Sequence, residues 1–307
     1  MATWITCGAM LALACSTNRD DSEFFEPSAV GTLVLDALLV VGRPLPSVTL
    51  SRALSPTVPY TQEAAAESGA TVRIFVLATG DVVDYRETAR PGTYRAMDPF
   101  VIVAPNSTYE VTAVTSKGEV LRSRTTTPEQ FAISEWVLLD DLGQNVVRTF
   151  STYASSGDSV YSENQVVYAE GLLEARFARP NVPAFQVGIF SLDMDSDYVI
   201  EPEYFSEEDF ANLDRQGASP ALEGPDGALR LPWFAIFFQG RYKLRILALD
   251  NNAFDFVRSI PQDDGAIAFG GNLGGRFERP IFHVEGGIGL FGSASADSVA
   301  LFVLPRP

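Results

Sequence analysis

The sequence predicts an all-β protein: an N-terminal Ig-like or transthyretin-like β-sandwich followed by a larger β-rich domain with one short helix. The chain has 21 Phe and 10 Tyr but only 4 Met, and aromatic side chains suit the half-buried surface of a sheet. Short apolar or alternating runs recur between Gly- and Pro-rich turn signals. Hydrophobic residues make up 46% of the 307 residues, which argues against a disordered chain.

The opening of the first domain is its clearest element. We expect this domain over residues 29–127. Gly31 to Arg52 predicts a hairpin whose first strand is apolar on both faces, and such a strand is expected to be central in its sheet. A Pro-Leu-Pro sequence interrupts the run, because proline cannot donate to a ladder. Further strands are expected at 71–77, 82–87, 93–96 and 109–115.

A second β-rich domain is expected over residues 128–307. Its strands are predicted from alternating or apolar runs at 136–139, 146–153, 165–173, 185–192, 233–238, 242–249 and 298–304. One helix is predicted at about 207–216, because Ser206 suits an N-cap and Gly217 suits the position after a helix end.

The first residues predict a lipoprotein signal segment and a tether. Residues 1–14 are uncharged and mostly apolar, but a membrane-spanning helix needs about 20 such residues. Cys15 follows a stretch that resembles a lipobox, so we expect it to be the acylated (palmitate-bearing) residue of a Gram-negative outer-membrane lipoprotein. A buried cysteine in a cytosolic protein is the alternative. Residues 16–28 are polar and acidic, which predicts a flexible tether. The face of the membrane on which the protein lies is left open.

Charge and residue counts exclude several classes of site. The formal net charge is −17, and no basic cluster stands out, so we expect no nucleic-acid partner. The acidity indicates a solvated surface, although a cation-rich habitat or bound divalent ions would also explain it. Both cysteines lie in the first fifteen residues and there is one histidine, which excludes a disulfide framework in the body and a typical structural zinc site.

One acidic motif is a candidate Ca²⁺ site. Asp193, Asp195 and Asp197 place carboxylates at alternate positions, as in the first half of an oxygen-rich calcium loop. Tyr198 stands where such a loop needs glycine. Exposed strand or loop residues give the same spacing without a metal, so both interpretations stay open.

No catalytic residues are predicted. His283 is the only imidazole and lies in an apolar run without a G-x-S-x-G motif before it, which favours a structural histidine over the base of a hydrolase. A glycosidase with paired carboxylates remains open, since 39 acidic residues are available. Trp136 and Trp233 belong to aromatic runs that fit a core better than a stacking platform for sugars.

Several motifs resemble one family. LVLDALLV at 33–40, PGTYRA at 91–96 and the glycine-rich run at 286–292 are similar to Bacteroidota-type outer-membrane lipoproteins that carry domain of unknown function 4249. A looser resemblance links the first domain to transthyretin-like and carboxypeptidase-regulatory sandwiches of TonB-dependent receptors. The family has no established activity. The resemblance implies a lipid anchor and a sandwich fold and, by analogy, a role beside a TonB-dependent transporter.

These observations favour a lipid-anchored, non-catalytic binding or assembly module of the cell envelope that needs no cofactor. Two alternatives stay open. One is an extracellular glycoside hydrolase, and the other is a purely structural envelope protein.

Overall fold

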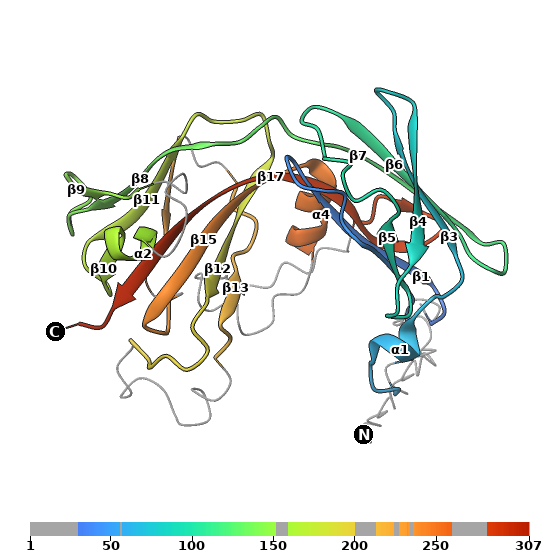
Figure 1. Cartoon of the computed structure of the whole chain (residues 1–307), viewed down its shortest axis with the longest axis horizontal. Coiled ribbons are helices and arrows are strands. Elements are labelled where there is room, and N and C mark those ends of the chain that lie inside the picture. Colours follow the sequence, from blue (N-terminus) through green and yellow to red (C-terminus); the bar gives the residue numbers. More distant parts are fainter. Residues whose placement is uncertain are drawn as a thin grey trace, which may run out of the picture.

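The computed structural model describes residues 30–55, 57–151, 159–199, 213–223, 227–231, 233, 236–259 and 281–306. Its strands form two sheets, which confirms the predicted all-β class. Figure 1 shows two β-rich lobes at opposite ends of an arch, with one long strand running from one lobe into the other. We call them lobe 1, which follows the N-terminal residues, and lobe 2.

Lobe 1 is an antiparallel sheet that curls around its own core. The strand order β1-β2-β5-β4-β3-β6-β7-β16 is continuous within the larger sheet. Its elements are β1 (Leu33–Val40), β2 (Val48–Arg52), α1 (Gln62–Ala65), β3 (Thr71–Val76), β4 (Asp81–Glu87), β5 (Thr93–Ala96), β6 (Thr108–Val114), β7 (Val120–Thr126) and β16 (Val284–Glu285).

Lobe 2 packs a second sheet against the extension of the first. The order β13-β12-β15-β17 continues the large sheet, and β14-β11-β8-β9 forms the small one. The elements are β8 (Ile133–Leu139), β9 (Val146–Thr149), α2 (Ser159–Glu163), β10 (Gln165–Val167), β11 (Leu172–Phe177), β12 (Ala184–Ser191), β13 (Gln216–Ala218), β14 (Ala228–Leu231), β15 (Gly240–Leu249), α4 (Asn251–Ser259) and β17 (Ile288–Leu304).

The predicted opening hairpin is confirmed. β1 pairs antiparallel with β2, Leu33 opposite Arg52, and on its other edge it pairs parallel with β17, Val34 opposite Ile288. β1 is therefore central, as its two apolar faces predict. One face, with Leu35 and Leu39, belongs to the core of lobe 1, while Leu38 on the other face packs against the cluster around α4.

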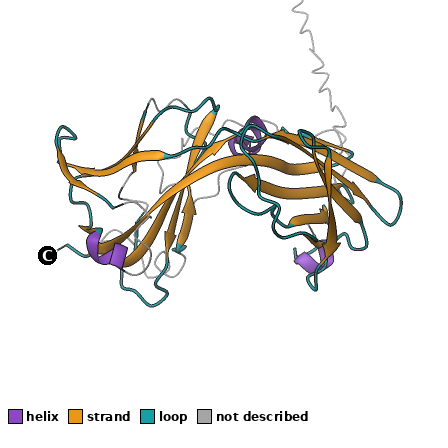
Figure 2. Cartoon of the chain, turned by 45° about the horizontal axis from the view of Figure 1, so that its top comes forward, coloured by secondary structure: helices purple, strands orange, loops and turns teal. Residues whose placement is uncertain are grey.

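β17 connects the two lobes. Its first half pairs with β1, and from Ala294 onward it pairs with β15. Phe291 belongs to the core of lobe 1, whereas Val299 and Leu301 belong to the core of lobe 2. All three have odd numbers and therefore face the same side of the strand. Helix α4 covers the other side near Leu290 and Ala294, and Figure 2 shows it between the lobes.

The secondary structure differs from the prediction at three places. The strand predicted at 233–238 is wrong, because the described residues there include a 3₁₀ turn at Trp233 and only an isolated bridge at Phe238. β7 was not predicted. The glycine-rich run before residue 293 forms the first half of β17, so the last strand begins ten residues earlier than the predicted 298.

The predicted helix at 207–216 lies mostly outside the described residues, and Gln216 begins β13. α1, α2 and α4 were not predicted. The division of the chain into domains at residue 127 stays a prediction, since β17 takes part in the sheets of both lobes.

Candidate functional site

A buried polar network holds the lobes together at the middle of β17. Asp250, directly after β15, accepts hydrogen bonds through Oδ1 from the backbone N–H groups of Ser293 and Ala253, both at 2.9 Å. The Thr125 hydroxyl of β7 donates to the other carboxylate oxygen, and it lies 2.9 Å from the Ser293 hydroxyl. Side chains from lobe 1, β15 and β17 thus meet at one carboxylate.

Asp250 also caps helix α4. Its carboxylate satisfies the Ala253 N–H in the first turn, which has no partner within the helix. Burial raises the pKa of the Asp250 carboxyl, although the hydrogen bonds from Ser293 and Thr125 oppose that shift. The net shift is upward, so burial outweighs these hydrogen bonds and disfavours the charged form of the carboxyl.

A polar pocket of about 840 Å³ opens beside this network. Asn252 forms part of its wall, and its amide donates to the backbone oxygens of Arg124 and Phe291, at 2.8 and 2.9 Å. Four asparagine side chains provide both donors and acceptors, which suit a polar ligand or a polypeptide segment. The lining residues are Asn106, Arg124, Thr125, Thr126, Thr127, Pro128, Glu129, Asn181, Val182, Pro183, Leu249, Asp250, Asn251 and Asn252.

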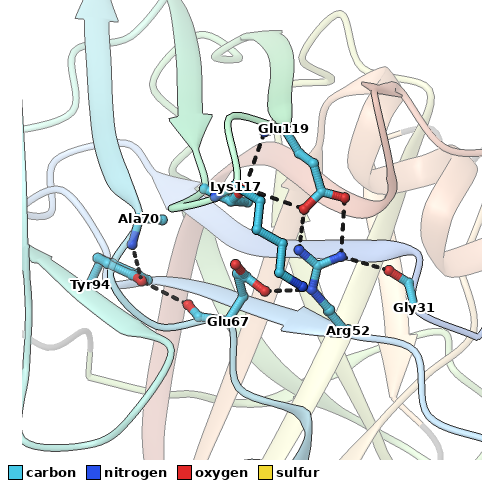
Figure 3. Close-up of polar contacts among 8 residues, drawn as sticks. Gly31, Arg52, Glu67, Ala70, Tyr94, Lys117 and Glu119 are labelled. Carbon is cyan, nitrogen blue, oxygen red and sulfur yellow. Dashed lines mark hydrogen bonds and ion pairs between the residues drawn. The ribbon is translucent and has the colours of Figure 1, made fainter.

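A second polar cluster fixes the point where the chain enters lobe 1. Figure 3 shows Arg52 between two carboxylates, with Nε 2.5 Å from Oε2 of Glu67 and Nη1 3.2 Å from Oε1 of Glu119. The same guanidinium donates to the backbone oxygen of Gly31 at 2.9 Å. The Tyr94 hydroxyl in turn donates to the Glu67 backbone oxygen at 2.7 Å. Arg52 thereby ties the first described residues to β2 and to the β6–β7 turn.

We expect Arg52→Ala to destabilise the protein by about 1–3 kcal/mol, because the nearly buried Glu67 carboxylate loses its charged partner. Arg73→Ala is the matched control. It breaks an ion pair with Asp84 in which both side chains are more than half exposed, and its effect should stay below about 1 kcal/mol. Denaturant unfolding measures both. Equal effects of the two substitutions would contradict a special role for Arg52.

The pH dependence of this difference has a defined sign. Hydrogen bonding to Arg52 lowers the pKa of Glu119, so its contribution is present above the unfolded pKa of about 4.3 and is lost as the pH falls through the folded value. The gap between wild type and Arg52→Ala should therefore narrow below about pH 4.

The structure does not gather the predicted Ca²⁺ ligands. Asp193 accepts hydrogen bonds from the Arg241 side chain at 2.8 Å and backbone at 2.7 Å, so a cation already faces it. Asp197 accepts from the side chain of Gln239 at 2.9 Å. Asp195 lies exposed in the turn between them. Among the described residues, no three His, Cys, Asp or Glu side chains are grouped closely enough to hold a metal ion.

The other predicted residues have structural contacts or lie outside the description. His283 Nε2 lies 2.7 Å from Oδ2 of Asp255 on α4, and this contact links the residue just before β16 to the helix. Trp136 and Trp233 belong to the core of lobe 2, as the favoured interpretation predicts. Cys15 and the tether at 16–28 precede the described residues.

A family model described as "Domain of unknown function (DUF4249)" matches residues 21–299, which include nearly all of both lobes. The chain belongs to this family. No curated protein matches it. Within the residues that the structure describes, no helix is long and apolar enough to cross a membrane.

Membership of the DUF4249 family assigns no functional site. The network of Asp250, Thr125 and Ser293, here called the junction network, was not predicted from the sequence. Thr125 lies 125 residues before Asp250, and Ser293 lies 43 residues after it, so no local motif joins them. One signal was available. Asp250 follows an apolar strand and precedes Ala253 by three residues, and this position fits the N-cap of a helix.

Proposed function

We propose that this DUF4249 protein is a lipid-anchored, non-catalytic binding or assembly module of the cell envelope. It is tethered to the outer membrane through Cys15 and works beside a TonB-dependent transporter. The polar pocket beside Asp250, here called the junction pocket, is the observation that supports the proposal. It is polar, and both lobes contribute to its wall, so a bound segment would contact both lobes at once.

The way the lobes are joined supports this function. β17 runs through both cores without a break, and the Asp250 network bonds β7 to β15 and β17 beside the pocket. Such a connection keeps the two walls of the pocket at a fixed spacing, which lowers the ordering cost of binding a partner. A tether at 16–28 would present this preformed surface away from the membrane.

We expect Cys15→Ser to release the protein from the membrane fraction and to abolish labelling by a palmitate analogue, because the thiol is the acceptor of the anchor. Cys7→Ser is the matched control, since it changes the other cysteine of the signal segment and should leave both readouts intact. Labelling and membrane retention of Cys15→Ser would refute lipidation at this residue.

The assembly function is tested by purifying the full-length, tagged lipoprotein from its native membrane in mild detergent. A TonB-dependent transporter should co-purify in a fixed ratio, and the amount should fall when Asn181 and Asn251 in the pocket wall are both replaced by Ala. An isolated monomer that cleaves members of a glycan library would instead support the glycoside hydrolase alternative and overturn the module.

A further inference from the structure

Arg245 lies on the face of the large sheet opposite the core of lobe 2, and the charge of Arg43 is close enough to act on it. Arg245 lies on β15 between core residues Leu244 and Ile246, so its side chain faces the side opposite to the core of lobe 2. Its cross-strand neighbours are Gly188 on β12 and Ser298 on β17. Neither neighbour has a side chain long enough to cover the guanidinium, which lies against the ring of Phe190 on β12 instead.

Arg43 approaches from the end of β1. The chain leaves this strand with a hydrogen bond from Val41 N–H to Ala294 of β17 and then turns, with the Arg43 N–H donating to Val40. Arg43 therefore follows β1 beside the middle of β17, and Arg245 lies on the strand at the other edge of β17. Burial lowers the pKa of Arg245, and the positive charge of Arg43 lowers it further, so the two cations sense each other.

The Nε–H group of Arg245 lacks an acceptor among the described residues. Its Nε is buried and has no hydrogen-bond partner, and it is the single buried side-chain atom of this kind among the described residues. The guanidinium lies over the ring of Phe190, 4.9 Å from the ring centroid, which fixes its plane but satisfies no N–H group. An unsatisfied donor on a charged group costs more than one on a neutral group.

Other arginines of the described chain contrast with this pair. Seven of them form ion pairs with carboxylates: Arg52, Arg73, Arg124, Arg176, Arg230, Arg241 and Arg258. Within the same described part, neither Arg43 nor Arg245 has an acidic partner, although the protein carries a net charge of −17. Two neighbouring cations, one with a buried free donor, are stabilised when an anion lies between them.

We infer that Arg43, Arg245 and the Ser298 hydroxyl form a binding site for an oxyanion, a carboxylate or phosphate group carried by a ligand or partner. The planar guanidinium presents paired N–H groups that match two oxygens of such a group, and stacking on Phe190 sets its orientation in advance. The inference goes beyond the proposed function, because it adds a second binding site whose residues do not line the junction pocket.

The test titrates purified full-length protein separately with inorganic phosphate and with succinate, followed by calorimetry and by thermal unfolding. We expect one-to-one binding of at least one of them, weakened at least about tenfold by Arg245→Gln and by Arg43→Gln. Arg90→Gln is the matched control, because it removes the same charge from an exposed loop. Binding of phosphate alone, of succinate alone or of both identifies the group that the site accepts.

The stability of each variant is also measured without ligand, to show that any loss of binding is not caused by misfolding. Arg245→Gln removes a partly buried charge and its repulsion by Arg43, so the free variant should be at least as stable as the wild type. The inference is overturned if neither anion binds at millimolar concentration, or if both arginine variants bind like Arg90→Gln. The absence of anion binding would not change the expected co-purification of a transporter. The two experiments therefore test the two proposals separately.

Discussion

Asp250→Ala should destabilise the protein by about 2–5 kcal/mol, one of the two largest losses that we expect from a single substitution. The change removes the acceptor of two buried N–H groups, those of Ser293 and Ala253, and the partner of the Thr125 hydroxyl. It also removes the cap of α4. Denaturant unfolding gives the loss, and hydrogen exchange should show that the Ser293 amide becomes less protected.

Two further variants define the cause. Asp250→Asn keeps one carbonyl oxygen for the two N–H groups and should cost less than Asp250→Ala. Asp81→Ala removes an exposed carboxylate at the start of β4 and should change stability by no more than about 0.5 kcal/mol. A loss for Asp250→Ala as small as that for Asp81→Ala would contradict the role of the network.

The pH dependence separates the charge of Asp250 from its hydrogen bonds. Burial raises its pKa, so its contribution is fully present below the unfolded pKa of about 3.9 and declines as the pH rises through the folded value. Asp250→Asn does not titrate. The stability of the wild type relative to this variant should therefore fall as the pH rises above about 4, and a difference that stays constant with pH would contradict the assignment.

Gly289→Ala should have an effect of similar size, about 3–5 kcal/mol, because β1 and β17 approach too closely there for a side chain. Gly289 lies opposite Leu35 in the parallel pair and has φ +112°. A Cβ atom at this position would lie 2.1 Å from the backbone oxygen of Leu35, so the two strands would have to separate. Thermal and denaturant unfolding measure the loss.

Gly118→Ala is the matched control for Gly289→Ala. Gly118 also has a positive φ, +83°, but a Cβ atom there would meet nothing within 4 Å. The control thus contains the backbone strain without the clash and should cost about 1 kcal/mol. If both substitutions cost the same, close approach of the strands would not explain the glycine in β17.

Much of lobe 1 could be predicted from the sequence. β1, β3, β4, β5 and β6 agree with the predicted runs within one residue at each end, because their alternation and turn signals are local. The central position of β1 also followed from its two apolar faces. The early start of β17 was not predicted, since a glycine required for close strand packing looks the same in sequence as one required for a turn.

The candidate sites could not be predicted in the same way. Asp250 and Thr125 meet only because two lobes share one sheet, and the charge of Arg43 acts on Arg245 from the end of the strand on the other side of β17. The alternate basic residues at 241, 243 and 245 are visible in the sequence, but only the fold shows that the last of them has no carboxylate partner among the described residues. Asp193, in contrast, fitted a metal motif and proved to face Arg241.

The shared strand β17 also sets the order in which the protein can acquire its structure. β1 cannot complete its pairing until a segment about 250 residues later in the chain has been synthesised, so the first lobe remains unfinished at its β17 edge. An early lobe would normally fold while the rest is still being made. We therefore expect the closure of both lobes to coincide with the arrival of β17, the final strand.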